Sequence, residues 1–136
     1  GMIIRSVCAS PMYGILLPEK NSAKLDSLVI KASTGTLFKA KIIRCDTLEP
    51  VLDRLKQQTT QIIGIDAGGT LSIADKTTNS RRQVYVLGNE TKGISKGCQA
   101  LCNNFMQIPM CNQVESLNVS VAASLIAFRS TINPAL

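Results

Sequence analysis

The sequence contains no histidine and no tryptophan. Without histidine the chain cannot form a Ser-His-Asp or Cys-His catalytic arrangement, and no imidazole is available as acid, base or metal ligand. Any reaction must therefore use Arg, Lys, Asp, Glu, Ser, Cys, Tyr or backbone groups. The absence excludes histidine-dependent hydrolases and two-histidine metal enzymes.

Cysteines are few and odd in number: Cys8, Cys45, Cys98, Cys102 and Cys111. Cys98 and Cys102 lie four apart on a predicted helix, but no second pair follows at the spacing of a zinc site. An odd count without a secretion signal favours reduced thiols that pack as small apolar side chains. The sequence predicts no metal site.

Long apolar runs are also missing. The longest, Leu117 to Phe128, is interrupted by Asn118, Ser120 and Ser124, and it is shorter than the roughly 18 residues expected of a membrane-spanning helix. The N-terminus lacks the basic segment and apolar core of an export signal. We therefore expect a cytoplasmic protein with no membrane partner.

The chain has the composition of a folded domain. Its 136 residues are 45% hydrophobic and 18% charged, which suits one globular domain over residues 1–136. The formal net charge is +6 and the pI about 9.3. Such a surface favours polyanions, of which nucleic acid is the commonest.

Short apolar runs alternate with helical patterns along the chain. Continuous β-branched and leucine runs are typical of strands buried on both faces of a parallel sheet. This alternation predicts an α/β domain with a mostly parallel sheet flanked by helices. The expected strands are 14–17, 40–43, 62–65, 84–87 and 105–108, and the expected helices are 3–11, 25–33, 47–58, 94–103 and 117–131. Residues 70–82 are polar and predict an exposed connection.

The last predicted helix is apolar on nearly every side. Ser116 is placed to cap it, and only a narrow stripe of Ser116, Ser120 and Ser124 is polar. A helix of this kind must be covered all round. Two sources of cover stay open: a second copy of the chain, which we favour, and burial within the monomer.

Three segments carry residues suited to binding. In the first, Leu87 to Ser95, a predicted buried strand ends at Gly88 and a polar loop leads into a helix. Ligands of α/β sheets bind at such strand ends. The spacing of Gly88 and Gly93 is that of a phosphate loop, but Ile94 stands where the lysine belongs. We therefore reject a nucleotide-triphosphatase, and no G-x-G-x-x-G supports a dinucleotide site.

The second segment runs from Ile108-Pro109-Met110 to Ser116-Leu117-Asn118. Considered alone, its polar residues are explained as a helix cap and a supported first turn. The third, Met2 to Ser6, contains Arg5, which alone is an ordinary surface arginine.

Together these segments resemble the three signature motifs of the SpoU/TrmH branch of the SPOUT methyltransferases. Gly1 to Ser6 is similar to the tail of motif one, Leu87 to Ser95 to motif two, and Ile108-Pro109-Met110 with Ser116 to Ala122 to motif three. Leu17-Pro18-Glu19 and Lys31 to Phe38 also stand where the family keeps such residues. The resemblance covers essentially the whole chain. The motif-one asparagine and the strand before it would precede Gly1, so we expect an N-terminally shortened domain.

The resemblance implies a deep trefoil knot near the C-terminus, an S-adenosylmethionine pocket in that knot, and a homodimer through the C-terminal helix. It implies a catalytic neighbourhood of Arg5, Glu90, Ser116 and Asn118. Arg5 would bind substrate phosphate and stabilise the forming alkoxide, while Glu90 would position Arg5 or Asn118. Cofactor-binding residues would be Leu87, Gly88, Ile108, Leu117, Met110, Thr34 and Gly35, and RNA-binding residues Arg81, Arg82, Lys92, Lys96 and Lys20.

The implied function is methylation of a ribose 2′-hydroxyl in tRNA or rRNA. The alternative is a catalytically impaired homodimer that binds RNA or cofactor, which the missing start of motif one motivates. Methylation of a small molecule is disfavoured by the basic surface.

Overall fold

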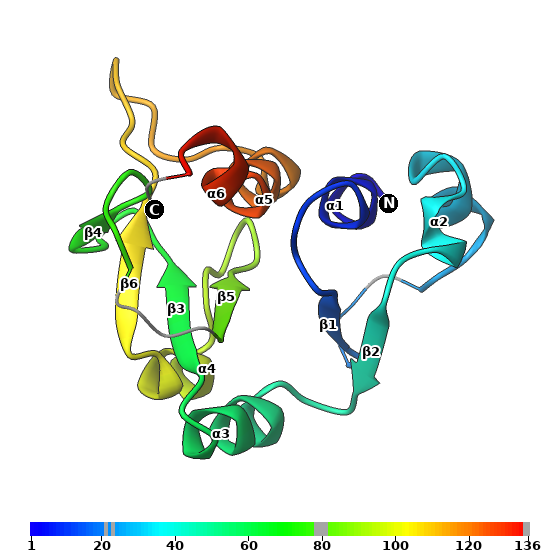
Figure 1. Cartoon of the computed structure of the whole chain (residues 1–136), viewed down its shortest axis with the longest axis horizontal. Helices are drawn as coiled ribbons and strands as arrows, with labels where there is room; N and C mark the ends of the chain where they lie inside the picture. The colour runs from blue at the N-terminus through cyan, green and yellow to red at the C-terminus, as the bar shows by residue number, and fades with distance from the viewer. Residues whose placement is uncertain (21, 23, 78–81, 135–136) are drawn as a thin grey trace.

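Two parallel sheets organise the computed structural model, which describes residues 1–20, 22, 24–77 and 82–134 (Figure 1). The elements are α1 (Met2–Cys8), β1 (Ile15–Pro18), α2 (Ser27–Ala32), η1 (Thr36–Phe38), β2 (Ile42–Cys45), α3 (Glu49–Gln57), β3 (Gln61–Ile65), β4 (Leu71–Ser72), β5 (Gln83–Leu87), α4 (Lys96–Leu101), β6 (Asn104–Gln107), α5 (Val119–Ala127) and α6 (Arg129–Ile132). Strand order is β4-β6-β3-β5 in the larger sheet and β1-β2 in the smaller.

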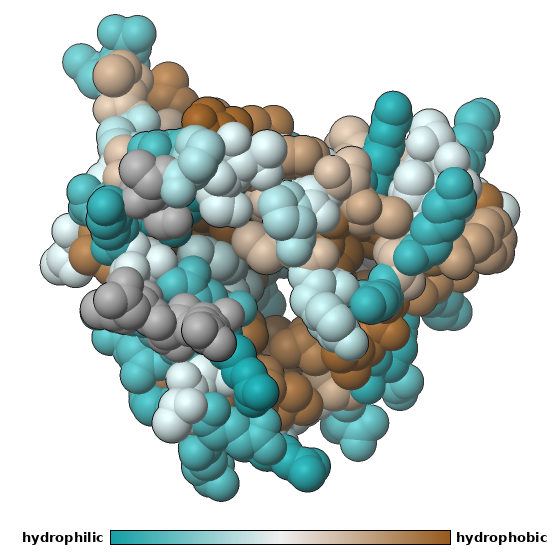
Figure 2. Space-filling view, in the orientation of Figure 1, coloured by the Kyte–Doolittle hydropathy of each residue, from teal (hydrophilic) through white to brown (hydrophobic). Residues whose placement is uncertain are grey.

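The predicted α/β class with parallel strands is confirmed. All five expected strands are present, with ends displaced by no more than two residues, and each strand pair described is parallel. The expected single sheet, however, is divided. β1 and β2 pair only with each other among the described residues, and Figure 2 shows an opening between the two parts, bordered by hydrophobic atoms.

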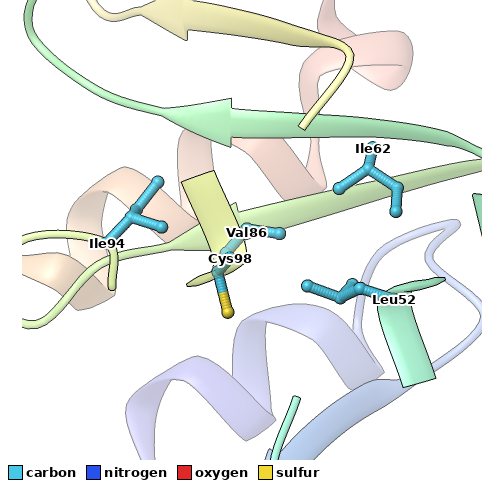
Figure 3. Close-up of a cluster of buried hydrophobic side chains, with 5 residues drawn as sticks. All are labelled: Leu52, Ile62, Val86, Ile94 and Cys98. Atoms are coloured by element: carbon cyan, nitrogen blue, oxygen red, sulfur yellow. The ribbon is translucent and has the colours of Figure 1, made fainter. Parts of the chain in front are cut away.

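The larger sheet has a hydrophobic core on each face. Because successive side chains of a strand point to opposite faces, Ile62 and Ile63 of β3 enter different clusters. Ile62 packs with Leu52, Val86, Ile94 and Cys98 beneath α3 and α4 (Figure 3). Ile63 packs with Met106 and Ile126 on the side covered by α5. The sheet is therefore a middle layer between helices.

α1 joins the smaller sheet to the rest of the molecule. It packs along α5, and the hydroxyls of Ser6 and Ser124 lie 2.7 Å apart across this contact. Its buried residue is Ile4. Through α1, the segment that leads into β1 is anchored to the C-terminal helix.

Two local predictions are wrong. The expected helix 117–131 begins later and is interrupted at Phe128, and its cap is Asn118 instead of Ser116. Asn118 has the extended backbone of a capping residue, and its side chain accepts the amide of Ser120 at 2.9 Å; Ser116 lies two residues too early to reach the first turn. The expected open connection 70–82 contains the short strand β4, which pairs with β6.

Candidate functional site

The loop after β5, Gly88–Gly93, closes on itself. Asn89 and Gly93 exchange two backbone hydrogen bonds of 2.9 and 2.8 Å. The Asn89 side-chain oxygen also accepts the amides of Thr91 and Lys92. Gly93 has φ +66°, a backbone conformation that glycine adopts without strain. The following residue, Ile94, is 5% exposed in the core, so the loop is fixed at both ends.

Gly88 is required by close packing. A Cβ at this position would lie 2.4 Å from the carbonyl carbon of Gly93 and 2.6 Å from the nitrogen of Ile94. Any side chain would therefore push the two ends of the loop apart. The glycine keeps the strand end and the start of the α4 segment in contact.

The loop after β6, 108–117, offers many backbone groups. Within it, the backbone hydrogen bond described is Val114 N–H to Cys111 O, at 3.2 Å. Asn112 and Gln113 have positive φ values of 55° and 61°. Ile108 and Met110 are half-buried, and Leu117 is 37% exposed. Such a segment combines apolar contact surface with backbone donors and acceptors that have no backbone partner among the described residues.

Glu90 and Asn118 join these two loops. The Asn118 side-chain amide donates to Glu90 Oε1 at 3.1 Å, and the Val119 amide approaches the same oxygen at 3.4 Å. The Asn118 side-chain oxygen faces the other way and accepts from the Ser120 amide and hydroxyl. A carboxylate at the first turn of a helix is also stabilised by the helix dipole. The parent strands β5 and β6 are not neighbours, because β3 lies between them.

Arg5 lies on α1, which packs against α5, the helix that Asn118 caps. Its neighbour Ser6 contacts Ser124, which lies six residues beyond Asn118 along α5, or about 9 Å of helix. The Arg5 side chain is exposed, and within the described part of the chain it makes no hydrogen bond or ion pair. It is therefore available to a ligand.

Other predicted residues are less closely connected. Thr34 and Gly35 form the left-handed turn after α2, with φ values of 52° and 76°. This turn is held by Ser33, which is fully buried, and within the described residues no hydrogen bond joins it to the loops after β5 and β6. Ser116 is exposed and one residue before Leu117. Leu87 is the last residue of β5 and pairs in register with Ile65.

The predicted RNA-binding residues are spread over the surface. Lys20, Arg82, Lys92 and Lys96 are exposed; Lys92 lies within the Gly88–Gly93 loop and Lys96 lies three residues after it. Arg81 lies outside the described residues.

Sequence reasoning missed Asn89 and Ser120 as organisers of the site. Asn89 binds two amides of its own loop, and the Ser120 hydroxyl donates to Asn118 Oδ1 at 2.6 Å. A signal was available, because asparagine after a strand-ending glycine is a common side-chain-to-backbone turn former.

Three of the five cysteines, Cys45, Cys98 and Cys102, are poorly suited to act as nucleophiles in this arrangement. Burial raises the pKa of Cys98 and of Cys102, and it likewise raises the pKa of Cys45 with help from the charge of Asp46. Thiols with raised pKa values stay protonated at neutral pH and react slowly. In the part of the chain described, no group of three or more Cys, Asp or Glu side chains converges as metal ligands do.

No helix among the described residues has the length and apolar character to cross a bilayer.

Comparison with known proteins gives a consistent result. The model of the SpoU rRNA Methylase family matches residues 1–128. Proteins of Mycolicibacterium gilvum and Mycobacterium tuberculosis, each named an uncharacterized tRNA/rRNA methyltransferase, are 33% and 34% identical over 126 residues. These alignments cover 93% of this chain but only 40% and 39% of the relatives, so the chain spans well under half of their length.

Solved structures share the fold. The SpoU methyltransferase AviRb from Streptomyces viridochromogenes, in complex with the cofactor AdoMet, superposes with a TM-score of 0.87 at 26% identity, over 98% of this chain and 52% of that one. A putative RNA methyltransferase of the TrmH family from Porphyromonas gingivalis gives 0.83 at 23% identity, over 94% and 52%.

Proposed function

Because the chain belongs to the SpoU rRNA methylase family, we propose that it transfers the methyl group of S-adenosylmethionine to a ribose 2′-hydroxyl of tRNA or rRNA, working in the cytoplasm where these RNAs are found. The observation that carries the proposal is the hydrogen bond between Glu90 and Asn118, which joins the loops after β5 and β6 at one place. Those loops contain most of the residues that resemble motifs two and three.

The residues present suit the cofactor. S-adenosylmethionine supplies a methyl group on a sulfonium, which an oxygen nucleophile can displace. The half-buried side chains of Leu87, Ile108 and Met110 offer apolar contact to an adenine ring. Within the described part of the chain, the 108–117 backbone has groups without backbone partners, and these can hydrogen-bond to the edge of the adenine and to a ribose. Leu117, Thr34 and Gly35 are further contacts in this proposal.

The chain's own residues have to align the hydroxyl and accommodate its proton loss. In the transfer, the 2′-O–H bond breaks, an O–CH₃ bond forms, the S–CH₃ bond breaks, and the thioether S-adenosylhomocysteine leaves while the proton passes to solvent. Arg5 binds the adjacent phosphate and stabilises the oxygen as its negative charge develops. Glu90 holds Asn118 in place, and Ser116, two residues before Asn118 in the chain, completes the proposed set. Holding the hydroxyl at the correct approach angle is the larger part of this catalysis.

Methyl transfer from radiolabelled cofactor to bulk tRNA and rRNA tests the proposal. We expect Arg5→Ala to lower kcat by about 100-fold, while Arg54→Ala, an exposed arginine on α3, keeps wild-type activity. Methylation at the ribose makes the modified linkage resistant to alkaline hydrolysis, because the 2′-oxygen can no longer attack the phosphate. Alkali-sensitive product would indicate base methylation, and cofactor binding without transfer would indicate the impaired binding protein instead.

We further propose a homodimer formed through the C-terminal helix. Met2, Val121 and Ile132, on α1, α5 and α6, are 59%, 46% and 73% exposed, and apolar surface of this kind is typical of association sites. Sedimentation velocity should show a dimer for the wild type and a monomer for Val121→Glu. Leu28→Glu, at an equally apolar position on α2 that is 74% exposed, should remain dimeric.

We also propose that the C-terminal segment is threaded as a deep trefoil knot. β4 pairs with β6, and the Arg129 side chain donates to the carbonyl oxygens of Ile73 and Asp75. These contacts support a loop held between β6 and α6. A main-chain trace from crystals tests it: if the main-chain curve, once its two ends are joined, can be deformed into a simple circle, the knot is absent.

A further inference from the structure

A cavity of about 310 Å³ lies at the C-terminal end of α1. Val7 and Cys8 of α1 line it, together with Tyr13 just before β1, Ile15 at the start of β1, and Lys39 and Lys41 before β2. Its size is at the lower end of the range for small-ligand sites, so it has room for one nucleotide but not for a helix.

The walls of this cavity differ in character. Val7 and Ile15 present apolar side chains, whereas Lys39 and Lys41 bring two positive charges, and none of the lining residues is acidic. Residues 1–46 contain seven of the 15 basic residues and three of the nine acidic ones. This third of the chain therefore holds +4 of the net charge of +6, and Figure 2 shows hydrophilic side chains standing out where α2 lies.

Tyr13 gives the cavity an open aromatic face. The residue is 78% exposed, and the Lys41 ammonium lies 4.1 Å from its ring centroid. Proteins that bind single-stranded nucleic acids combine an exposed aromatic ring with basic side chains. The ring stacks on the face of a base, and the basic side chains contact the phosphates.

The cavity also lies next to the proposed catalytic arginine. Cys8 follows Arg5 by three residues on α1, and such residues are neighbours on one helix face, about 5–6 Å apart at Cβ. Arg5 does not itself line the cavity, but it lies within one helical turn of Cys8, which does.

We propose that this cavity binds an unstacked nucleotide of the RNA, close along the strand to the one that is methylated. Tyr13 stacks on its base, and Lys39 and Lys41 contact the phosphates on either side. This inference rests on the proposed function, because it assumes that RNA is the substrate. It adds a binding site for single-stranded RNA that is separate from the cofactor loops.

Fluorescence anisotropy tests the proposal with a labelled single-stranded RNA of about twelve nucleotides and with the same strand annealed to its complement. We expect Tyr13→Ala to weaken single-strand binding by about tenfold or more, with little change for the duplex. Tyr13→Phe, which keeps the ring, should bind as the wild type does. Lys41→Gln should reduce the slope of log binding constant against log salt concentration by about the amount expected for one phosphate contact.

Matched controls are available nearby. Phe38 is 76% exposed and precedes Lys39 but does not line the cavity, so Phe38→Ala should bind normally. Lys24→Gln removes an exposed lysine elsewhere and should keep the wild-type preference for single-stranded over duplex RNA. Melting temperatures equal to that of the wild type show that each variant is folded.

The outcomes separate this inference from the proposed function. If the wild type methylates RNA and Tyr13→Ala binds single strands as tightly as the wild type, the cavity has no such role and the function stands. Equal weakening of single-strand and duplex binding also overturns the inference, because a general charged surface then explains it. If the wild type methylates no RNA but still shows the Tyr13-dependent preference for single strands, the binding site is supported and the proposed function fails.

Discussion

The larger and the smaller sheet are stabilised in different ways. In the larger sheet Ile62 and Ile63 are fully buried in two clusters, one on each face. In the smaller sheet no residue of β1 or β2 is buried to that degree, and Ile43 is 49% exposed. The smaller sheet depends on its hydrogen bonds and on the packing of α1 against α5.

This difference matches the division of the proposed site. The larger sheet supplies the loops that would hold the cofactor, together with Glu90 and Asn118. The smaller part supplies Arg5 and the Tyr13 cavity, which would contact RNA. A substrate-binding part that is less firmly packed than the rest is expected, because segments that bind ligands are commonly drawn from the less stable parts of a fold.

The largest effect should come from truncating the larger core. Ile62→Ala should lower the free energy of unfolding by about 3–4 kcal/mol, because it leaves a cavity in a fully packed cluster. Ile42→Ala in β2, where the side chain is half-buried, should cost about 1–2 kcal/mol because the site is partly open already. Urea denaturation measures both. Equal losses would show that the two sheets are packed alike.

A buried arginine ties the C-terminus to the larger sheet. Arg129 is 7% exposed and donates to the carbonyl oxygens of Ile73 and Asp75 and, at 3.3 Å, to the Tyr85 hydroxyl. Arg129→Met should cost about 2–3 kcal/mol, since buried carbonyl groups lose their donor. Arg129→Lys should recover only part of this, because a lysine ammonium lacks the planar fork. Ser130→Ala, at an exposed neighbour, is the control, and Arg129→Met as stable as that control would contradict the prediction.

Features that depend on residues close together in the sequence were predicted, and features that depend on residues far apart in the sequence were not. Strands β3 and β5 were predicted because their apolar runs are local, and Glu90 and Asn118 were singled out because they stand in the resembling motifs. The division into two sheets was not predicted, because hydropathy does not encode which strand pairs with which. The buried Arg129 was not predicted either, since its partners Ile73, Asp75 and Tyr85 lie 44 to 56 residues away in the sequence.

Hydrogen exchange sharpens the comparison at the level of single strands. Amides of β1 and β2 should exchange through local opening at a free energy about 2 kcal/mol below that of β3 and β5, or roughly 30-fold faster. Native-state exchange read by mass spectrometry on peptides from each sheet gives the two values. If β1 exchanges only by global unfolding, together with β3, the two parts form one cooperative unit.

The smallest effect concerns a contact within the larger part, between α3 and the start of α4. The hydrogen bond of Glu49 to its own backbone amide, and then the Ser95 hydroxyl, which donates to Glu49 Oε1 at 3.1 Å, lower the pKa of the Glu49 carboxyl. A carboxyl whose pKa is lower in the folded chain adds stability above the unfolded pKa, and that stability is lost as the pH falls through the folded value. Wild type should therefore exceed Glu49→Gln in stability at neutral pH, and the two unfolding curves should converge in acid below about pH 4. A gap that stays constant from neutral to acid pH would show that the difference comes from packing at the α3–α4 contact and not from the charge.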